Sequence, residues 1–183
     1  SYKSGTALVS VVESPHFTST NAAGSWHKFT ITNTAPWTGS VTCRVLCAVM
    51  GNTTNFGGVV HFDGLTLTET AIARTNAQSG SIKNPGFEYT ANGTVFDAID
   101  SWTNFGNAGN TDSAYTRSGN RGLKIYYPGQ LLLQNWSPTV GYTYTNMVYA
   151  YTPSGADRFT GSTNTYALLV MEFLDSTGTN VVG

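Results

Sequence analysis

Short alternating apolar runs limit this chain to a β-structure more strongly than any other feature of the sequence. Nearly every run has an apolar residue at every second position and stops at Gly, Pro, Asn or Ser. That period places one side of an extended strand against a core, whereas a helix needs a period near 3.6 residues. The segments with this pattern are Ala7–Val12, Trp26–Thr32, Ser40–Met50, Val59–Phe62, Leu65–Thr68, Gly122–Tyr126, Leu131–Trp136, Tyr142–Tyr151, Tyr166–Leu174 and Asn180–Val182. They predict an all-β sandwich, with longer loops at 90–100 and 104–113.

The composition excludes several classes of partner. Only 10% of the residues are charged and the net charge is −1, so the chain lacks the basic surface that nucleic-acid binding requires. No apolar stretch is long enough to span a bilayer. The low charge, the many Thr and Asn residues, and the glycosylation sequons at Asn52 and Asn92 favour an extracellular protein.

The two cysteines, Cys43 and Cys47, share one face of a predicted strand. Four residues along a strand span about 13 Å, which is too far for a disulfide between them. No further metal ligands lie at close spacing, so we expect both cysteines to act as small buried hydrophobic residues.

Catalysis is not expected. No pair of carboxylates is marked by its setting as an acid with a base or nucleophile. The three histidines are isolated, and no phosphate-binding loop or serine-hydrolase motif is present.

Residues 73–80 are polar and include no large apolar residue. This composition predicts a linker between residues 1–72 and 81–183. Each part supplies about half of the predicted strands. Neither would cover its own apolar faces and sheet edges in isolation.

The part after the linker carries a series of short motifs: Asn84-Pro85-Gly86-Phe87-Glu88, Ser101-Trp102, Gly119–Lys124 and Gly141-Tyr142-Thr143-Tyr144. It resembles the opening half of the calcium-containing jelly-roll carbohydrate-binding modules attached to glucanases and xylanases. Elements similar to the closing half of those modules lie before the linker: Trp26–Phe29, Ala35-Pro36, Arg44-Val45 and His61–Leu65.

Reading from Gly183 directly into Ser1 restores the order of the resembling modules. The resemblance therefore implies a two-sheet antiparallel jelly roll in which 81–183 is the N-terminal half and 1–72 the C-terminal half. Such a sandwich must be completed across the chain ends, or by a neighbouring subunit or repeat. We rank a tandem array or fibre first, a circular permutant second and a piece of two consecutive domains last.

The resemblance also implies a structural calcium ion held by Glu88 and Asp63. The second Asp of the family's last strand is replaced by Gly64. The alternative, equally open, is that the two carboxylates bond to nearby backbone or pair with Lys124.

Aromatic and amide side chains provide the candidates for glycan binding. Tyr149 and Tyr151 lie on the opposite strand face from Tyr144, Val148 and Ala150, which we expect in the core. The further candidates are Trp136, Gln134, Tyr127 and Arg158. We expect Trp26 and Trp102 in the core, and Trp37 in a turn that contacts a subunit.

The leading functional expectation is a non-catalytic, extracellular structural repeat of a fibre, sheath or surface layer whose partners are copies of itself. The alternative is a glycan-binding module of a secreted polysaccharide-degrading enzyme or adhesin, with a polysaccharide as partner.

Overall fold

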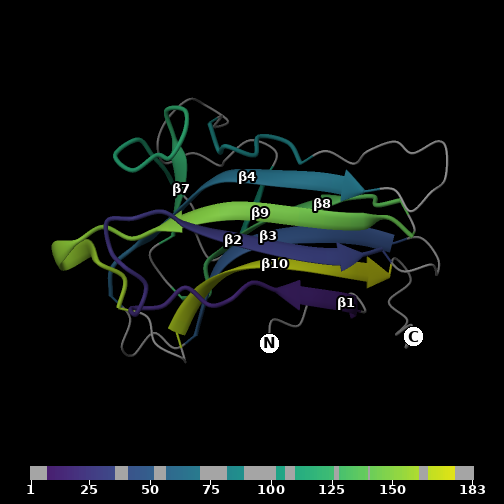
Figure 1. Ribbon diagram of the computed structural model, residues 1–183, viewed down its shortest axis with the longest axis horizontal. Helices are drawn as coiled ribbons and strands as arrows, with labels where there is room; N and C mark the ends of the chain where they lie inside the picture. Colours follow the sequence, from purple (N-terminus) through teal and green to yellow (C-terminus); the bar gives the residue numbers. More distant parts are fainter. Residues whose placement is uncertain are drawn as a thin grey trace.

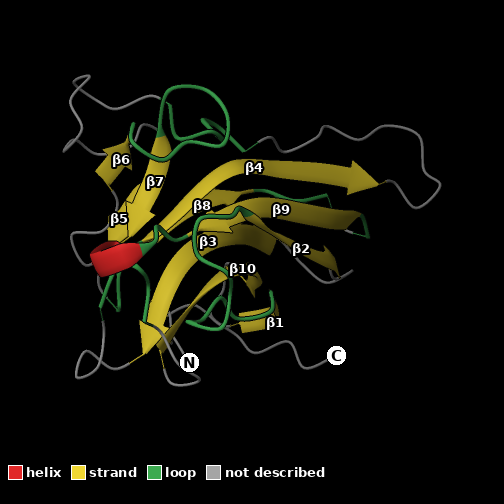
Figure 2. Ribbon diagram, turned by 60° about the vertical axis from the view of Figure 1, so that its left-hand side comes forward, coloured by secondary structure: helices red, strands yellow, loops and turns green. Residues whose placement is uncertain are grey.

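The alternating runs form strands that pair into two antiparallel sheets. The computed structural model describes residues 8–35, 41–51, 57–70, 82–88, 102–105, 110–125, 128–139, 141–160 and 165–175. Their strands are β1 (Leu8–Glu13), β2 (His27–Thr34), β3 (Val41–Gly51), β4 (Val60–Thr70), β5 (Thr103–Phe105), β6 (Asn110–Asp112), β7 (Gly122–Ile125), β8 (Leu131–Trp136), β9 (Thr143–Tyr151) and β10 (Thr165–Asp175). Sheet 1 has the order β1-β10-β3-β8-β5, and sheet 2 has the order β2-β9-β4-β7-β6 (Figures 1 and 2).

Strand pairing follows the plan of one long hairpin rolled up on itself. β1 pairs with β10, β2 with β9, β3 with β8 and β4 with β7, all antiparallel. From β1 to β4 and from β7 to β10, successive strands alternate between the two sheets. This alternation is the jelly-roll arrangement of a β-sandwich, and it confirms the predicted fold class.

The strands on the two sides of the predicted linker build one sandwich. In each sheet the first four strands come alternately from residues before 71 and after 81. Residues 73–80 lie outside the described part of the chain. Because β1 pairs with β10 of the same chain, the described strands complete the sandwich across the chain ends within one molecule.

The core lies between the sheets, but sheet 1 is apolar on both faces. Along β3, Val45, Cys47 and Val49 point into the main core, and Leu46 and Ala48 belong to a second buried cluster on the outer face. β8 and β10 add Leu131, Leu133, Leu168 and Val170 to that second cluster. Figure 2 shows the pronounced curvature of β3 and β10.

A β-bulge merges two predicted strands into one. The segments 59–62 and 65–68 form the single strand β4, whose register against β9 shifts between Asp63 and Thr66. Gly64 has a φ of 63°, a left-handed conformation that glycine adopts without strain. The Leu65 amide bonds to the Pro85 carbonyl at 3.2 Å.

The predicted loop 104–113 is only partly a loop. It includes most of β5 and all of β6, two three-residue strands at the edges of the sheets. Three residues are too few to show an alternating pattern, so neither strand can be recognised from the sequence.

Both cysteines are free and fully buried, as expected, and burial raises the pKa of both thiols. We predict that neither thiol reacts with a disulfide reagent in the native protein, because the reactive thiolate is disfavoured and access is blocked. Labelling with increasing urea should follow the loss of near-UV circular dichroism. Rapid labelling without urea would contradict this placement of β3.

Candidate functional site

Strand β9 lies between β2 and β4 in sheet 2. Its side chains alternate strictly between buried and half-buried. Tyr144, Val148 and Ala150 are in the core, and Tyr149 and Tyr151 lie on the outer face, as predicted. The pairing of β9 with β2 on one side and β4 on the other fixes the position of both tyrosines.

Four half-buried aromatic side chains gather on this outer face: Trp26, Tyr115, Tyr149 and Tyr151. We call them the aromatic face. The Tyr151 ring lies 5.1 Å from the Trp26 ring and 5.2 Å from the Tyr115 ring, centroid to centroid. The fully buried His61 contacts Tyr115 at 4.8 Å and Tyr151 at 6.1 Å. These contacts are within the range of favourable aromatic pairs.

Burial raises the pKa of the Tyr151 phenol, and the nearby Tyr115 phenol raises it further. The hydroxyl of Tyr151 therefore stays protonated at neutral pH. It is available there as both a hydrogen-bond donor and an acceptor.

The expectation that Trp26 lies in the core is wrong. On β2, Phe29 and Ile31 are buried and Lys28 and Thr30 are exposed. Trp26 lies directly before the strand, two positions from Lys28, and so is on the same outer face. It is half-buried against Tyr151. Trp102 is in the core, as expected.

A loop from β6 to β7 brings Tyr115 and Arg117 to the aromatic face. The buried Asp63 carboxylate accepts the backbone N–H groups of Arg117 at 2.7 Å and Ser118 at 2.8 Å through one oxygen. Its other oxygen accepts the Gly64 N–H at 2.6 Å. With its backbone anchored in this way, Arg117 places its guanidinium 3.6 Å from the centroid of the Tyr149 ring.

Glu88 anchors the same loop from the other side. Both of its carboxylate oxygens lie within hydrogen-bond distance of the Asn120 N–H, at 2.9 and 3.2 Å. Gly119 is required at the contact, because a Cβ there would collide with the Glu88 carboxylate and its φ is 68°. Phe87 has a φ of 58°, rare for a bulky residue, and its fully buried ring packs on Trp102.

Asp63 and Glu88 therefore converge on one loop, but as acceptors of amide N–H groups. This arrangement corresponds to the alternative stated in the sequence analysis, in which the two carboxylates bond to nearby backbone. N–H groups aimed at these oxygens present positive charge where a cation would need lone pairs. Within the described residues, no three His, Cys, Asp or Glu side chains come together to hold a metal ion. The residues as arranged do not fit a calcium ion, and calcium binding stays a prediction.

The other glycan-binding candidates lie elsewhere. Trp136 is in the core against Tyr144. Gln134 is also buried, and its amide exchanges hydrogen bonds of 2.7 and 3.0 Å with the Lys83 backbone. Arg158 is exposed after the 3-10 turn Gly155–Asp157 and donates to the Ser19 carbonyl at 2.9 Å. Three further residues lie outside the described part of the chain: Tyr127, Asn52 and Asn92.

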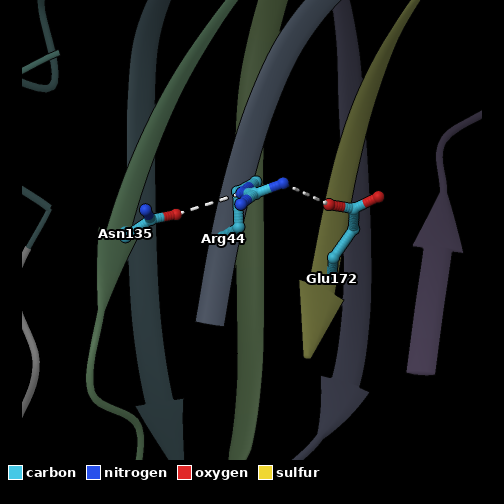
Figure 3. A network of polar contacts seen from close by, with 3 residues as sticks. All are labelled: Arg44, Asn135 and Glu172. Atoms are coloured by element: carbon cyan, nitrogen blue, oxygen red, sulfur yellow. Dashed lines mark hydrogen bonds and ion pairs between the residues drawn. The ribbon is translucent and has the colours of Figure 1, made fainter. Parts of the chain in front are cut away.

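The outer face of sheet 1 has a different character. Its apolar side chains line a groove with a volume of about 90 Å³ that runs between Tyr166 and Glu172. Beside the Glu172 end, Arg44 bonds to Asn135 at 3.1 Å and to Glu172 at 3.4 Å (Figure 3). Burial raises the pKa of the Glu172 carboxyl, Arg44 opposes that rise, and Glu13 adds to it.

Comparisons with family models, with curated proteins and with solved structures found no match to this chain. No helix in the described residues is both long and apolar enough to cross a membrane.

We predict that Asp63→Ala destabilises the protein by about 3 kcal/mol, because it leaves three amide groups without their acceptor. Asp63→Asn keeps one acceptor oxygen and should cost less. Urea unfolding measures both losses. Native-state trypsin cleavage after Arg117 should also speed up in Asp63→Ala, and an unchanged cleavage rate would contradict the anchoring role.

Melting with and without calcium, in wild type and Asp63→Asn, tests the calcium prediction in parallel.

A second prediction concerns Glu172. Its raised pKa means that the folded protein binds this proton more tightly than the unfolded chain does. Stability from this group is thus present at low pH and lost as pH rises through the folded pKa. Relative to Glu172→Gln, the wild type should gain melting temperature as the pH falls from neutral toward the ordinary glutamate pKa of about 4.3. The same pH dependence of melting temperature in both proteins would contradict the prediction.

Proposed function

We propose that this chain is a non-catalytic, extracellular glycan-binding module that uses the aromatic face of sheet 2. The observation that carries this proposal is the contact between Trp26, Tyr115 and Tyr151 on an outward face, where all three stay partly exposed. The outer face of an antiparallel sheet is normally polar, so a cluster of partly exposed aromatic rings there indicates a binding surface.

The chemistry of the aromatic face suits a sugar. The C–H-lined faces of a pyranose ring are apolar and stack on aromatic rings, and its hydroxyls need hydrogen-bond partners. Tyr115 and Tyr151 supply phenol groups next to the rings. Arg117 adds exposed N–H donors.

The same surface continues as a row of hydroxyl groups along the strands. Thr32 bonds to Thr145 across β2 and β9, and Thr34 bonds to Thr143, each at 2.9 Å between hydroxyl oxygens. The β2 threonines are exposed. A polysaccharide lying along β9 would meet aromatic rings first and hydroxyl groups beyond them.

The aromatic face is held in place before any ligand arrives. Tyr149 and Tyr151 are on a strand paired on both sides, and Tyr115 is on a loop anchored by Asp63. Such preorganisation reduces the entropy cost of binding.

The expectation of a structural repeat in a fibre, sheath or surface layer stays a prediction. One part of its argument was a sheet that a neighbouring copy could complete; the others were the short linker and the weakly charged surface. Pairing of β1 with β10 inside one chain removes the first part for the described strands. Electron microscopy of concentrated protein is the direct test, since regular filaments would restore assembly as a function.

Titration of soluble glucans, xylans, mannans and polyuronates, followed by tryptophan fluorescence and calorimetry, tests the glycan proposal. We expect Trp26→Ala or Tyr151→Ala to weaken binding of the bound glycan by about tenfold or more.

Tyr166→Ala is the matched control. Tyr166 is also a half-buried tyrosine on an outer sheet face, stacked on His16 at 3.6 Å, but it belongs to sheet 1. It should bind as the wild type does. Equal losses of affinity in all three variants, or no binding to any of the glycans tested, would refute the aromatic face as the binding site.

A further inference from the structure

The identity of the glycan can be narrowed by the cations that flank Tyr149. Arg117 is exposed, and its guanidinium covers the face of the Tyr149 ring at 3.6 Å. Because of this contact, Tyr149 serves as a support for Arg117 more than as an open stacking surface. A planar guanidinium held on a ring presents its remaining N–H groups in a fixed geometry.

The backbone of Arg117 is equally restricted. Its own N–H and that of Ser118 bond to the buried Asp63, and the Asn120 N–H bonds to Glu88. Little conformational freedom is therefore left to lose when the guanidinium binds an anion. The fork geometry of arginine matches the two oxygens of a carboxylate.

A second cation belongs to the strand that pairs with β9 at Tyr149. Lys28 is the cross-strand partner of Tyr149 on β2, and both side chains are on the outer face. Directly paired positions have Cβ atoms about 5 Å apart, so the Lys28 side chain starts next to the Tyr149 ring. Lys28 is exposed.

Within the described residues, no carboxylate forms an ion pair with Arg117 or Lys28. The ion pair found there, Arg44–Glu172, is on the other sheet. Two carboxylates hold the Arg117 loop: Asp63 is fully buried with its oxygens engaged by three amide groups, and Glu88 accepts the Asn120 N–H. The solvent side of Tyr149 thus presents two positive groups beside a surface suited to sugar rings.

We propose that the ligand is an acidic polysaccharide whose uronate carboxylates bind between Arg117 and Lys28 while a neighbouring sugar ring stacks on Trp26 and Tyr151. This inference rests on the glycan-binding function proposed above and adds the charge of the substrate. It also assigns Arg117 and Lys28 as residues that determine specificity.

The test compares polygalacturonate and alginate with neutral glucan, xylan and mannan of similar length, and with a sulfated galactan. All titrations contain a chelator, so that calcium bridges between carboxylates do not contribute. We expect the polyuronates to bind more tightly than the neutral chains. Their affinity should also fall steeply between about 0.01 and 1 M salt, where the screening length drops from about 30 Å to 3 Å.

Variants separate the two cations from general charge effects. Arg117→Gln and Lys28→Gln should each weaken polyuronate binding by about tenfold and change neutral-glycan binding by less than about twofold. Arg117→Lys keeps the charge but loses the fork, and should recover only part of the affinity. Lys83→Gln removes the same unit of charge from an exposed lysine whose backbone is bonded to β8 of sheet 1, and should have no effect.

The outcomes distinguish this inference from the proposal beneath it. Binding of neutral glycans as tight as that of polyuronates and insensitive to salt would overturn the acidic ligand and leave glycan binding intact. Binding of the sulfated chain alone would overturn the carboxylate assignment. No binding to any polysaccharide would remove both proposals.

Discussion

Pairing between strands that are far apart in the sequence is the constraint on which this structure depends. Each of the four main pairs joins a strand from before residue 71 to one from after residue 81, and the eleven-residue register of β10 on β3 is the longest of the contacts. Loop closure must therefore precede almost every stabilising contact, which is typical of slowly folding β-proteins. The core forms only when the strands before residue 71 and those after residue 81 are both present, because they alternate in each sheet.

The alternating pattern predicted this architecture well where strands are long. The observed β8 spans the predicted residues, and β9 shows the predicted division between buried and outward tyrosines. The pattern failed at strand ends and in loops. Trp26 stands one residue outside β2, where an isolated tryptophan gives no indication of its side.

The loop residues of the site were beyond sequence reasoning for a physical reason. Tyr115 and Arg117 are positioned by Asp63, more than fifty residues earlier, through hydrogen bonds to the loop backbone. Backbone amides carry no sequence signal of their partner. Trp136 and Gln134 share one face of β8, but that face points to the core, so neither candidate lies on the surface. The same two carboxylates that the resemblance marks as cation ligands serve here to connect the sandwich to the aromatic face.

The bulge at Gly64 has a consequence for how this chain tolerates change in length. Phe62 and Leu65 are three positions apart, yet both side chains point into the core, since the additional residue resets the phase of the strand. Beyond the bulge, Leu67 packs on the core and Thr66 is exposed. Deletion of Gly64 would leave Phe62 and Leu65 two positions apart, so the strand would alternate without interruption, with Leu67 still inward and Thr66 still outward. The bulge is therefore a position at which β4 can lose one residue and keep both faces, whereas a deletion elsewhere in the strand would exchange them.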